Sequence, residues 1–214
     1  RIFALCTNEK VCYQLSLIWG VATVLVEFYS TTEEMIQNTG SLLNELGYVN
    51  KGDLFIDCTG FKSLLLTETF DVPFNSIEDF IPNNYAWATK IPYLDPETQI
   101  VNYTNCTAIE NGWIWEIPLF SRMGAGYVFS DKFVSTEGAL KEFQQGLTKK
   151  GYENVEDLEY HLIPMRCGIQ SKLWVKNTCA IGLAAGFVEP LQSNGLHCIH
   201  QFIFNLCRIL ERGY

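Results

Sequence analysis

The sequence predicts a mixed α/β (α+β) fold with an antiparallel sheet as one of its layers, and three observations predict it. The apolar run Leu54–Ile56 is typical of a short buried strand in a central sheet. Two segments, 136–150 and the stretch from Leu196 onward, repeat apolar residues at helical spacing. Three successive segments rich in strand-forming residues predict the middle of an antiparallel sheet: Gln99–Thr104, Gly112–Ile117 and Gly126–Ser130.

The N-terminal part of the chain adds a strand and a helix to this prediction. Residues Leu15–Phe28 are rich in amino acids that favour strands, and their apolar run is too short to span a bilayer. Thr31 and Glu34 have the spacing of a capping box, so a helix is expected from there to Leu46. A turn at Lys51–Gly52 separates this helix from the buried strand.

The remaining elements follow from prolines and from apolar spacing. Residues 68–97 carry four prolines and are expected to be rich in loops. The clearest helix is expected over 136–150, with a glutamate near its start and two lysines and a glycine at its end. Asn154–Leu162 is a shorter helix candidate. The last helix is expected to bury Leu196, Ile199, Phe202, Ile203, Leu206 and Leu210.

Composition excludes several classes of partner. A chain of 214 residues can bury a sizeable core, and a formal net charge of −9 argues against nucleic acid, whose phosphates require a basic face. Eight cysteines without a Cys-x-x-Cys pair, and only three histidines, give zinc poor support and favour free thiols in a reducing compartment. We therefore expect no metal site, no nucleic acid, no membrane and a cytoplasmic location.

The most informative stretch is Glu189–Gly195, which lies between an apolar run and the last helix. A polar turn at a strand-to-helix junction presents backbone N–H groups, and the helix start adds the positive end of its dipole. Such a junction is typical of an anion or cofactor site. The same residues also suit an ordinary helix cap, and the spacing alone leaves both interpretations open.

Three motifs, in the same order along the chain, resemble those of one family. Gly112–Pro118 resembles the Trp-x-Trp-x-Ile-Pro signature of the flavin-dependent tryptophan halogenases. Gly182–Leu191 resembles the flavin- and halide-site stretch of that family. Asp53–Phe61 resembles its strand leading to a glycine beside the dinucleotide. The resemblance extends from about Asp53 to the C-terminus.

The resemblance implies a flavin-monooxygenase-like FAD-binding fold, present in part, with the antiparallel sheet on the substrate side. It implies an FADH2-dependent halogenase of biosynthesis, in which a flavin reductase supplies reduced FAD. The flavin peroxide formed with oxygen would oxidise chloride or bromide, and the resulting hypohalous acid would halogenate an aromatic, indole-type substrate. A homo-oligomer is compatible with this interpretation.

The resemblance also implies roles for single residues around the last helix. Leu183 and Leu196 would flank the flavin, and Gly60 would lie beside the dinucleotide. The backbone N–H groups of Asn194 and Gly195 would hold the halide. Catalytic roles would fall to the two residues just before them, Gln192 and Ser193.

Trp113 and Trp115 would form a substrate gate between flavin and substrate, which favours halogenation over hydroxylation. On a strand their indoles share one face, while Ile114 and Glu116 face the other way. Without the resemblance, a pair of core aromatic residues would be the ordinary interpretation of this motif.

The chain departs from the family in three respects. Gln192 stands where the family has a catalytic glutamate, and Asn194 stands where it has threonine. A neutral amide exchanges hydrogen bonds but is no general base, so the tryptophan substrate is more in doubt than the halide site. No Gly-x-Gly-x-x-Gly turn is present. We therefore expect residues 1–214 to form a single partial domain of a longer halogenase.

Two other functions are compatible with the sequence. A related flavin monooxygenase would hydroxylate its substrate, against which the paired tryptophans argue. An inactive flavin-fold module would bind or assemble without catalysis, which the missing nucleotide turn and Gln192 favour.

Overall fold

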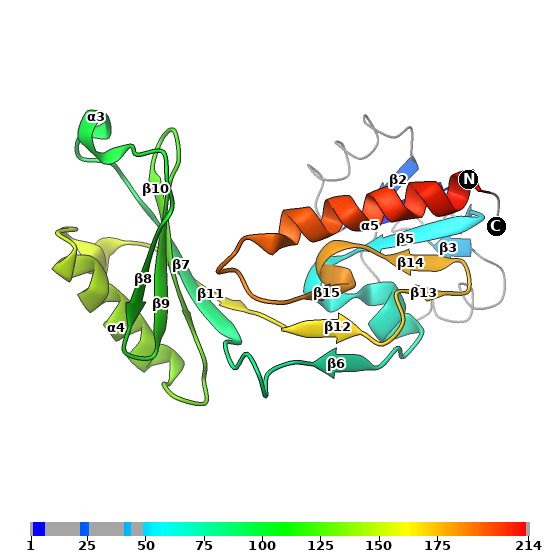
Figure 1. Ribbon diagram of the computed structural model, residues 1–214, viewed down its shortest axis with the longest axis horizontal. Coiled ribbons are helices and arrows are strands. Elements are labelled where there is room, and N and C mark those ends of the chain that lie inside the picture. Colours follow the sequence, from blue (N-terminus) through cyan, green and yellow to red (C-terminus); the bar gives the residue numbers. More distant parts are fainter. Residues whose placement is uncertain (1, 7–21, 26–40, 44–48, 213–214) are drawn as a thin grey trace. The chain divides into compact units, whose positions relative to one another are not determined.

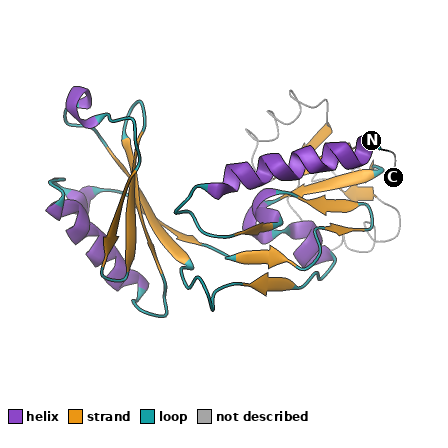
Figure 2. Ribbon diagram, viewed as in Figure 1, coloured by secondary structure: helices purple, strands orange, loops and turns teal. Residues whose placement is uncertain are grey.

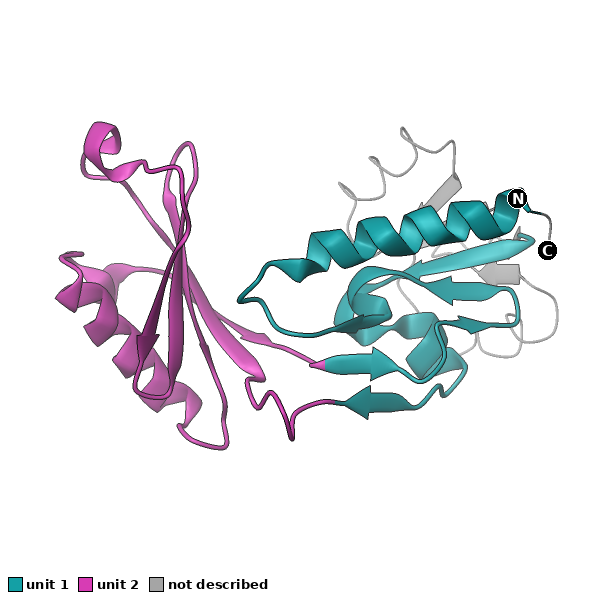
Figure 3. Cartoon of the chain, viewed as in Figure 1, with its two compact units in different colours: residues 1–76, 168–214 teal, residues 77–167 magenta. Residues whose placement is uncertain are grey.

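The computed structural model describes residues 2–6, 22–25, 41–43 and 49–212, with side chains from residue 52 onward (Figure 1). The chain divides into two compact units, which Figure 3 shows in different colours. Unit 1 comprises residues 1–76 and 168–214, and unit 2 comprises residues 77–167. Both units contain helices and sheets (Figure 2), so the predicted α+β class is confirmed.

The main sheet of unit 1 is parallel except at one edge. Apolar residues on both faces of its central strand are buried, as Leu54 and Phe55 of β5 (Leu54–Cys58) are, and such strands are stable inside a parallel sheet. The strand predicted at Leu54–Ile56 is therefore confirmed as an inner strand, with parallel neighbours on both sides. In spatial order the strands are β13 (Trp174–Val175), β14 (Thr178–Ala180), β5 (Leu54–Cys58), β1 (Ile2–Cys6) and β2 (Ala22–Leu25).

Two smaller sheets complete the strands described in unit 1. One joins β15 (Gly186–Phe187), β12 (Gly168–Gln170) and β6 (Phe74–Ser76). The other pairs β3 (Ser41–Leu43) with β4 (Val49–Lys51).

The last helix, α5 (Asn194–Glu211), packs one apolar stripe on the parallel sheet. Ile199, Phe202, Ile203 and Leu206 contact a buried cluster that includes Leu54, Cys179 and Ile181. The predicted helix is confirmed, but two of its expected core residues are wrong. Leu196 is 71% exposed and Leu210 is 38% exposed, because each lies near an end of the helix, away from that cluster.

Unit 2 is an antiparallel sheet with one helix on its face. In spatial order its strands are β11 (Tyr160–Pro164), β7 (Tyr85–Ile91), β10 (Met123–Phe129), β9 (Gly112–Pro118) and β8 (Asn105–Ile109). The helix α4 (Thr136–Lys149) begins at Ser135, whose side chain accepts a hydrogen bond from Gly138 N. Its buried residues, Ala139, Phe143 and Leu147, pack on the sheet, so the helix predicted at 136–150 is confirmed.

Four predicted elements differ from the structure. The helix expected up to Leu46 is wrong at Ser41–Leu43, which pairs with β4, and its earlier part lies outside the described residues. Of Leu15–Phe28, the structure describes Ala22–Leu25 as a strand. Residues 68–97 are rich in loops as expected, but the strands β6 and the seven-residue β7 also lie there. In β7, aromatic and β-branched residues alternate with two alanines and a lysine, a strand signal that the flanking prolines obscured.

The other two differences concern the segments 99–104 and 154–162. The strand expected at Gln99–Thr104 begins instead at Asn105, because Asp95 and the following proline start the short helix α3 (Pro96–Gln99). The helix expected at Asn154–Leu162 is a 3-10 turn followed by β11, an edge strand whose mostly exposed side chains show no clear period.

Among the described residues, no helix is long and apolar enough to cross a membrane. The described residues hold no group of three or more His, Cys, Asp or Glu side chains placed to bind a metal ion. The six cysteines whose side chains are described are free thiols. Burial, aided by the charge of Asp57, raises the pKa of the Cys179 thiol to about 11, so it remains protonated at neutral pH.

Candidate active site at the carboxyl edge of the parallel sheet

Two glycines mark the edge of the parallel sheet where strands β5 and β14 end. These strands are neighbours and parallel, so their carboxyl ends lie together. Gly60 follows β5 and Gly182 follows β14, with φ angles of +72° and +69° that glycine adopts without strain. Each glycine opens a 3-10 helix, and the two 3-10 helices contact one another. Ligands of open α/β sheets bind at this kind of edge.

A fully buried carboxylate holds the first of these turns. Asp57 accepts hydrogen bonds from Thr59 N at 3.0 Å and from Thr59 Oγ1 at 2.6 Å. It also accepts bonds from Leu65 N at 2.9 Å and Leu66 N at 3.2 Å, at the start of a π-helical turn, Leu64–Thr69. The carboxylate thus satisfies N–H groups that have no partner inside that helix.

Asp57 was not among the predicted site residues, although the sequence carried a signal. The order Asp-x-Thr, placed at the end of an apolar strand, is typical of side chains that bond to the following backbone. A second residue without such a signal is Gln170, which is buried between the turns. Its Nε2 donates to Ser63 Oγ at 3.1 Å and to Thr67 Oγ1 at 2.6 Å.

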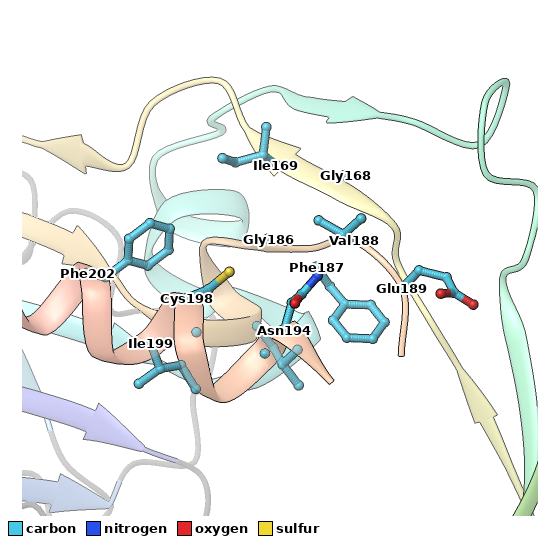
Figure 4. A pocket seen from close by; sticks show the side chains of 13 residues that line it. Gly168, Ile169, Gly186, Phe187, Val188, Glu189, Asn194, Cys198, Ile199 and Phe202 are labelled. Atoms are coloured by element: carbon cyan, nitrogen blue, oxygen red, sulfur yellow. The ribbon is translucent and has the colours of Figure 1, made fainter. Parts of the chain in front are cut away.

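A pocket opens between the second turn, β12, β15 and the first turns of α5 (Figure 4). It has an empty volume of about 610 Å3, part of which is open solvent. Phe187 in its wall makes an edge-to-face contact with Phe61, which follows Gly60, at 5.5 Å between ring centroids. The pocket therefore lies against both turns. It is lined by Gly168, Ile169, Gly182, Leu183, Gly186, Phe187, Val188, Glu189, Asn194, Gly195, Cys198, Ile199 and Phe202.

The start of α5 lies at this pocket without a side-chain cap. Ser193 occupies the N-cap position in a left-handed conformation, with φ at 53°, and its side chain makes no capping hydrogen bond. The interpretation of this stretch as an ordinary helix cap is therefore not met by the Ser193 side chain, because this backbone conformation is not the extended one that side-chain caps require. Asn194 and Gly195, the first helical residues, line the pocket.

Three predicted site residues come together and others do not. Leu183, Asn194 and Gly195 all line the pocket. Gly60 lies in the adjoining turn. Gln192, Ser193 and Leu196 are exposed at or just before the helix start and are not among the lining residues. The roles assigned to these residues stay predictions.

Trp113 and Trp115 belong to unit 2, where they share one face of β9. Their ring centroids lie 5.9 Å apart with the planes tilted by 57°. Ile114 and Glu116 are buried on the opposite face, as the strand period predicts. The Trp115 ring covers Gly126 of β10, where a Cβ atom would collide with it.

A comparison with known proteins agrees with this fold and this arrangement of motifs. The sequence model of the tryptophan halogenase family matches residues 15–213. Tryptophan 6-halogenase SttH of Streptomyces toxytricini is 43% identical over 163 residues, which cover 76% of this chain and 30% of that protein. The chain belongs to the tryptophan halogenase family. It spans about 30% of the length of the curated relatives it matches first.

Solved structures of the same family superpose on the chain. The crystal structure of SttH from Streptomyces toxytricini has a TM-score of 0.80 and 37% identity, covering 93% of this chain and 38% of that one. BrvH, a flavin-dependent halogenase from Brevundimonas sp. BAL3, has a TM-score of 0.76 and 33% identity, covering 89% of this chain and 38% of that one.

The residues around the pocket fit a flavin. The lining is largely apolar, which suits an isoalloxazine ring, and two positive-φ glycines keep the sheet edge free of side chains. A Cβ built on Gly195 would meet no atom within 4 Å, so the space before the helix start is open. The dipole of an eighteen-residue helix, α5, favours an anion there.

Proposed function

We propose that the chain forms the halide-side portion of a flavin-dependent halogenase that acts on an aromatic, indole-type substrate. The observation that carries the proposal is the pocket formed by Leu183, Asn194 and Gly195 at the carboxyl edge of the parallel sheet, in a chain that belongs to the tryptophan halogenase family. A bound reduced flavin supplies the oxygen-dependent oxidation of chloride or bromide. A separate flavin reductase is the partner that this chemistry requires.

The residues of this chain bind and orient rather than react. The 3-10 helix at Gly182 and the side chain of Leu183 line the pocket and would offer an apolar surface to a bound flavin. The N–H groups of Asn194 and Gly195 donate to the halide, and the dipole of α5 stabilises its charge. Gly60 would let the neighbouring turn approach a bound dinucleotide closely, because its left-handed conformation lets the chain turn sharply.

The direct test uses the full-length protein with a flavin reductase, a halide salt and a panel of indoles. Mass spectrometry of the products is expected to find halogenated indoles that require both flavin and halide. Hydroxylated products with no halogenation would support a related monooxygenase, and no turnover with retained flavin would support a binding module.

We expect Trp115→Ala to lower the ratio of halogenated to hydroxylated product. The resemblance of the Trp-x-Trp motif implies that this indole would separate substrate from flavin, and displacing a substrate by about 1 Å can cost roughly 100-fold in rate. Product analysis and flavin retention are measured together in the full-length protein. Trp115→Phe keeps an aromatic barrier and is expected to change the ratio less. Unchanged ratios in both variants would leave Trp115 as a packing residue on β9.

We expect Gln192→Glu to change substrate range or pH dependence more than flavin affinity. Gln192 is exposed in the loop before α5, so a carboxylate there is tolerated by the fold and adds a group that can accept a proton. Rates across pH with several indoles, beside a flavin titration, measure the difference. An identical product profile at every pH would argue against a place for Gln192 in the substrate site.

A further inference from the structure

The back of the Trp-x-Trp strand carries a buried polar cluster that the proposed chemistry does not use. Glu116 directly follows Trp115 on β9 and is only 6% exposed. Its Oε2 accepts hydrogen bonds from Lys150 Nζ and from Asn105 Nδ2, the latter at 3.0 Å. Its Oε1 accepts a hydrogen bond from the Tyr152 hydroxyl at 2.9 Å. One carboxylate therefore holds three donors.

The cluster joins the edge strand β8, the strand β9 and the end of α4. Lys150 is the C-cap residue of α4 and also donates to Thr107 Oγ1 on β8 at 2.7 Å. Asn105 lies directly opposite Glu116 in the register of β8 and β9. Burial, together with the hydrogen bond to Glu116, raises the pKa of Tyr152, so its hydroxyl keeps the proton that it donates.

Strand β9 is held on one side by β10, most of whose residues are buried, and Ile114 of β9 packs in the core of unit 2. The neighbouring strand β8 is the edge of the sheet, and Asn105, Cys106 and Ala108 on it are exposed. The charged cluster therefore adds side-chain contacts that join β9 to β8 and to the end of α4 directly behind Trp115. On the front face, the Trp115 ring packs over Gly126, so a shift of β9 would move the ring away from Gly126.

We infer that Glu116, with Lys150 and Tyr152, is a positioning group that sets the place of the Trp115 indole and thereby the preference for halogenation. The preference for halogenation rests on the proposed function, whereas the placement of Trp115 does not. Glu116 lies on the opposite face of the sheet from the rings of the tryptophan pair. Its effect is transmitted through the backbone of β9, which carries both side chains.

The test replaces Glu116 with glutamine, which keeps the volume and removes the charge. The full-length protein is labelled with 5-fluorotryptophan, and the fluorine resonance of Trp115 is assigned with Trp115→Phe. In Glu116→Gln this resonance is expected to shift or broaden. The ratio of halogenated to hydroxylated product is expected to fall by roughly 10-fold to 100-fold, in line with the cost of misplacing a positioning group.

The matched control is Glu142→Gln. Glu142 on α4 also accepts three hydrogen bonds at the back of this sheet, from Asn111 N, Asn111 Nδ2 and the Tyr127 hydroxyl. Asn111 lies just before β9, at the end away from Glu116, and Tyr127 lies on β10 opposite Ile114, so the Trp115 resonance and the product ratio are expected to change much less. Tyr152→Phe removes one of the three bonds to Glu116 and keeps the ring, so a smaller shift in the same direction is expected. The Tyr152→Phe variant also tests the inference if Glu116→Gln fails to fold.

The outcomes separate the placement of Trp115 from the enzymatic activity. An unmoved Trp115 resonance in folded Glu116→Gln or Tyr152→Phe would overturn the inference, whatever the product ratio. An equal shift in Glu142→Gln would also overturn it, because the effect would then be general to the sheet. If the unaltered protein shows no halogenation while the Trp115 resonance shifts as expected, the proposed function fails and the placement of Trp115 by Glu116 stands.

Discussion

Gly195→Val is expected to raise the halide concentration for half-maximal turnover by about 5- to 30-fold, since an anion at a partly buried helix start gains about 1–2 kcal/mol. A Cβ at Gly195 meets no atom within 4 Å, so the fold tolerates the new side chain. The side chain instead occupies the space in front of the N–H groups of Asn194 and Gly195. Halide titrations in the full-length protein, beside flavin titrations, measure the effect.

Two further measurements sharpen this prediction. Gly195→Ala adds a single methyl group to the same space and is expected to give a smaller increase. Crystals of the flavin-bound protein soaked in bromide should show an anomalous scattering peak at Asn194 and Gly195, which Gly195→Val should remove. A bromide peak elsewhere, with none at these residues, would withdraw the halide assignment.

Asp57→Ala is expected to lower the free energy of unfolding of unit 1 by about 3–5 kcal/mol, because each buried donor left without an acceptor costs about 1–3 kcal/mol. The change leaves the buried N–H groups of Thr59, Leu65 and Leu66 without their acceptor. Urea denaturation measures the change. Hydrogen exchange of peptides spanning residues 54–69 locates it.

The control for Asp57 is Asp131→Ala in unit 2. Asp131 is exposed and accepts a side-chain hydrogen bond from Asn84 at 2.8 Å, so a loss within about 1 kcal/mol is expected. Thr59→Ser keeps the hydroxyl that bonds to Asp57 and is expected to change stability little. A stable Asp57→Ala variant with slow exchange at Leu65 and Leu66 would show that the carboxylate does not hold the turn.

Features that depend on neighbours in sequence could be predicted. The alternation of Trp113 and Trp115 with Ile114 and Glu116 follows from the period of a strand, and the structure has it. The helix at 136–150 carried both an apolar stripe and end signals. The pocket was anticipated in part, because a strand, a glycine turn and a helix start follow one another within Thr178–Gly195.

Features that depend on the packing of distant segments could not be predicted. Lys150 and Tyr152 reach Glu116 only because α4 runs back along β8 and β9. The segment Tyr160–Pro164 forms a strand only because β7 offers an open edge, and that edge is not visible in its own sequence. The pairing register with β7 determines which side chains of this segment face the core. The apolar pattern of Asn154–Leu162 alone therefore favoured a helix instead of a strand.

The division of unit 1 between two separate stretches has a consequence for how the protein folds during synthesis. Strand β14 must pair with β5 across the whole of unit 2, a separation that makes this contact slow to form. Unit 2 is continuous, so its strands and helix are complete before residue 168 is made. Ser76 and Gly168 pair across β6 and β12, where the chain leaves and re-enters unit 1. A folded unit 2 between them shortens the effective loop and brings β14 within reach of β5.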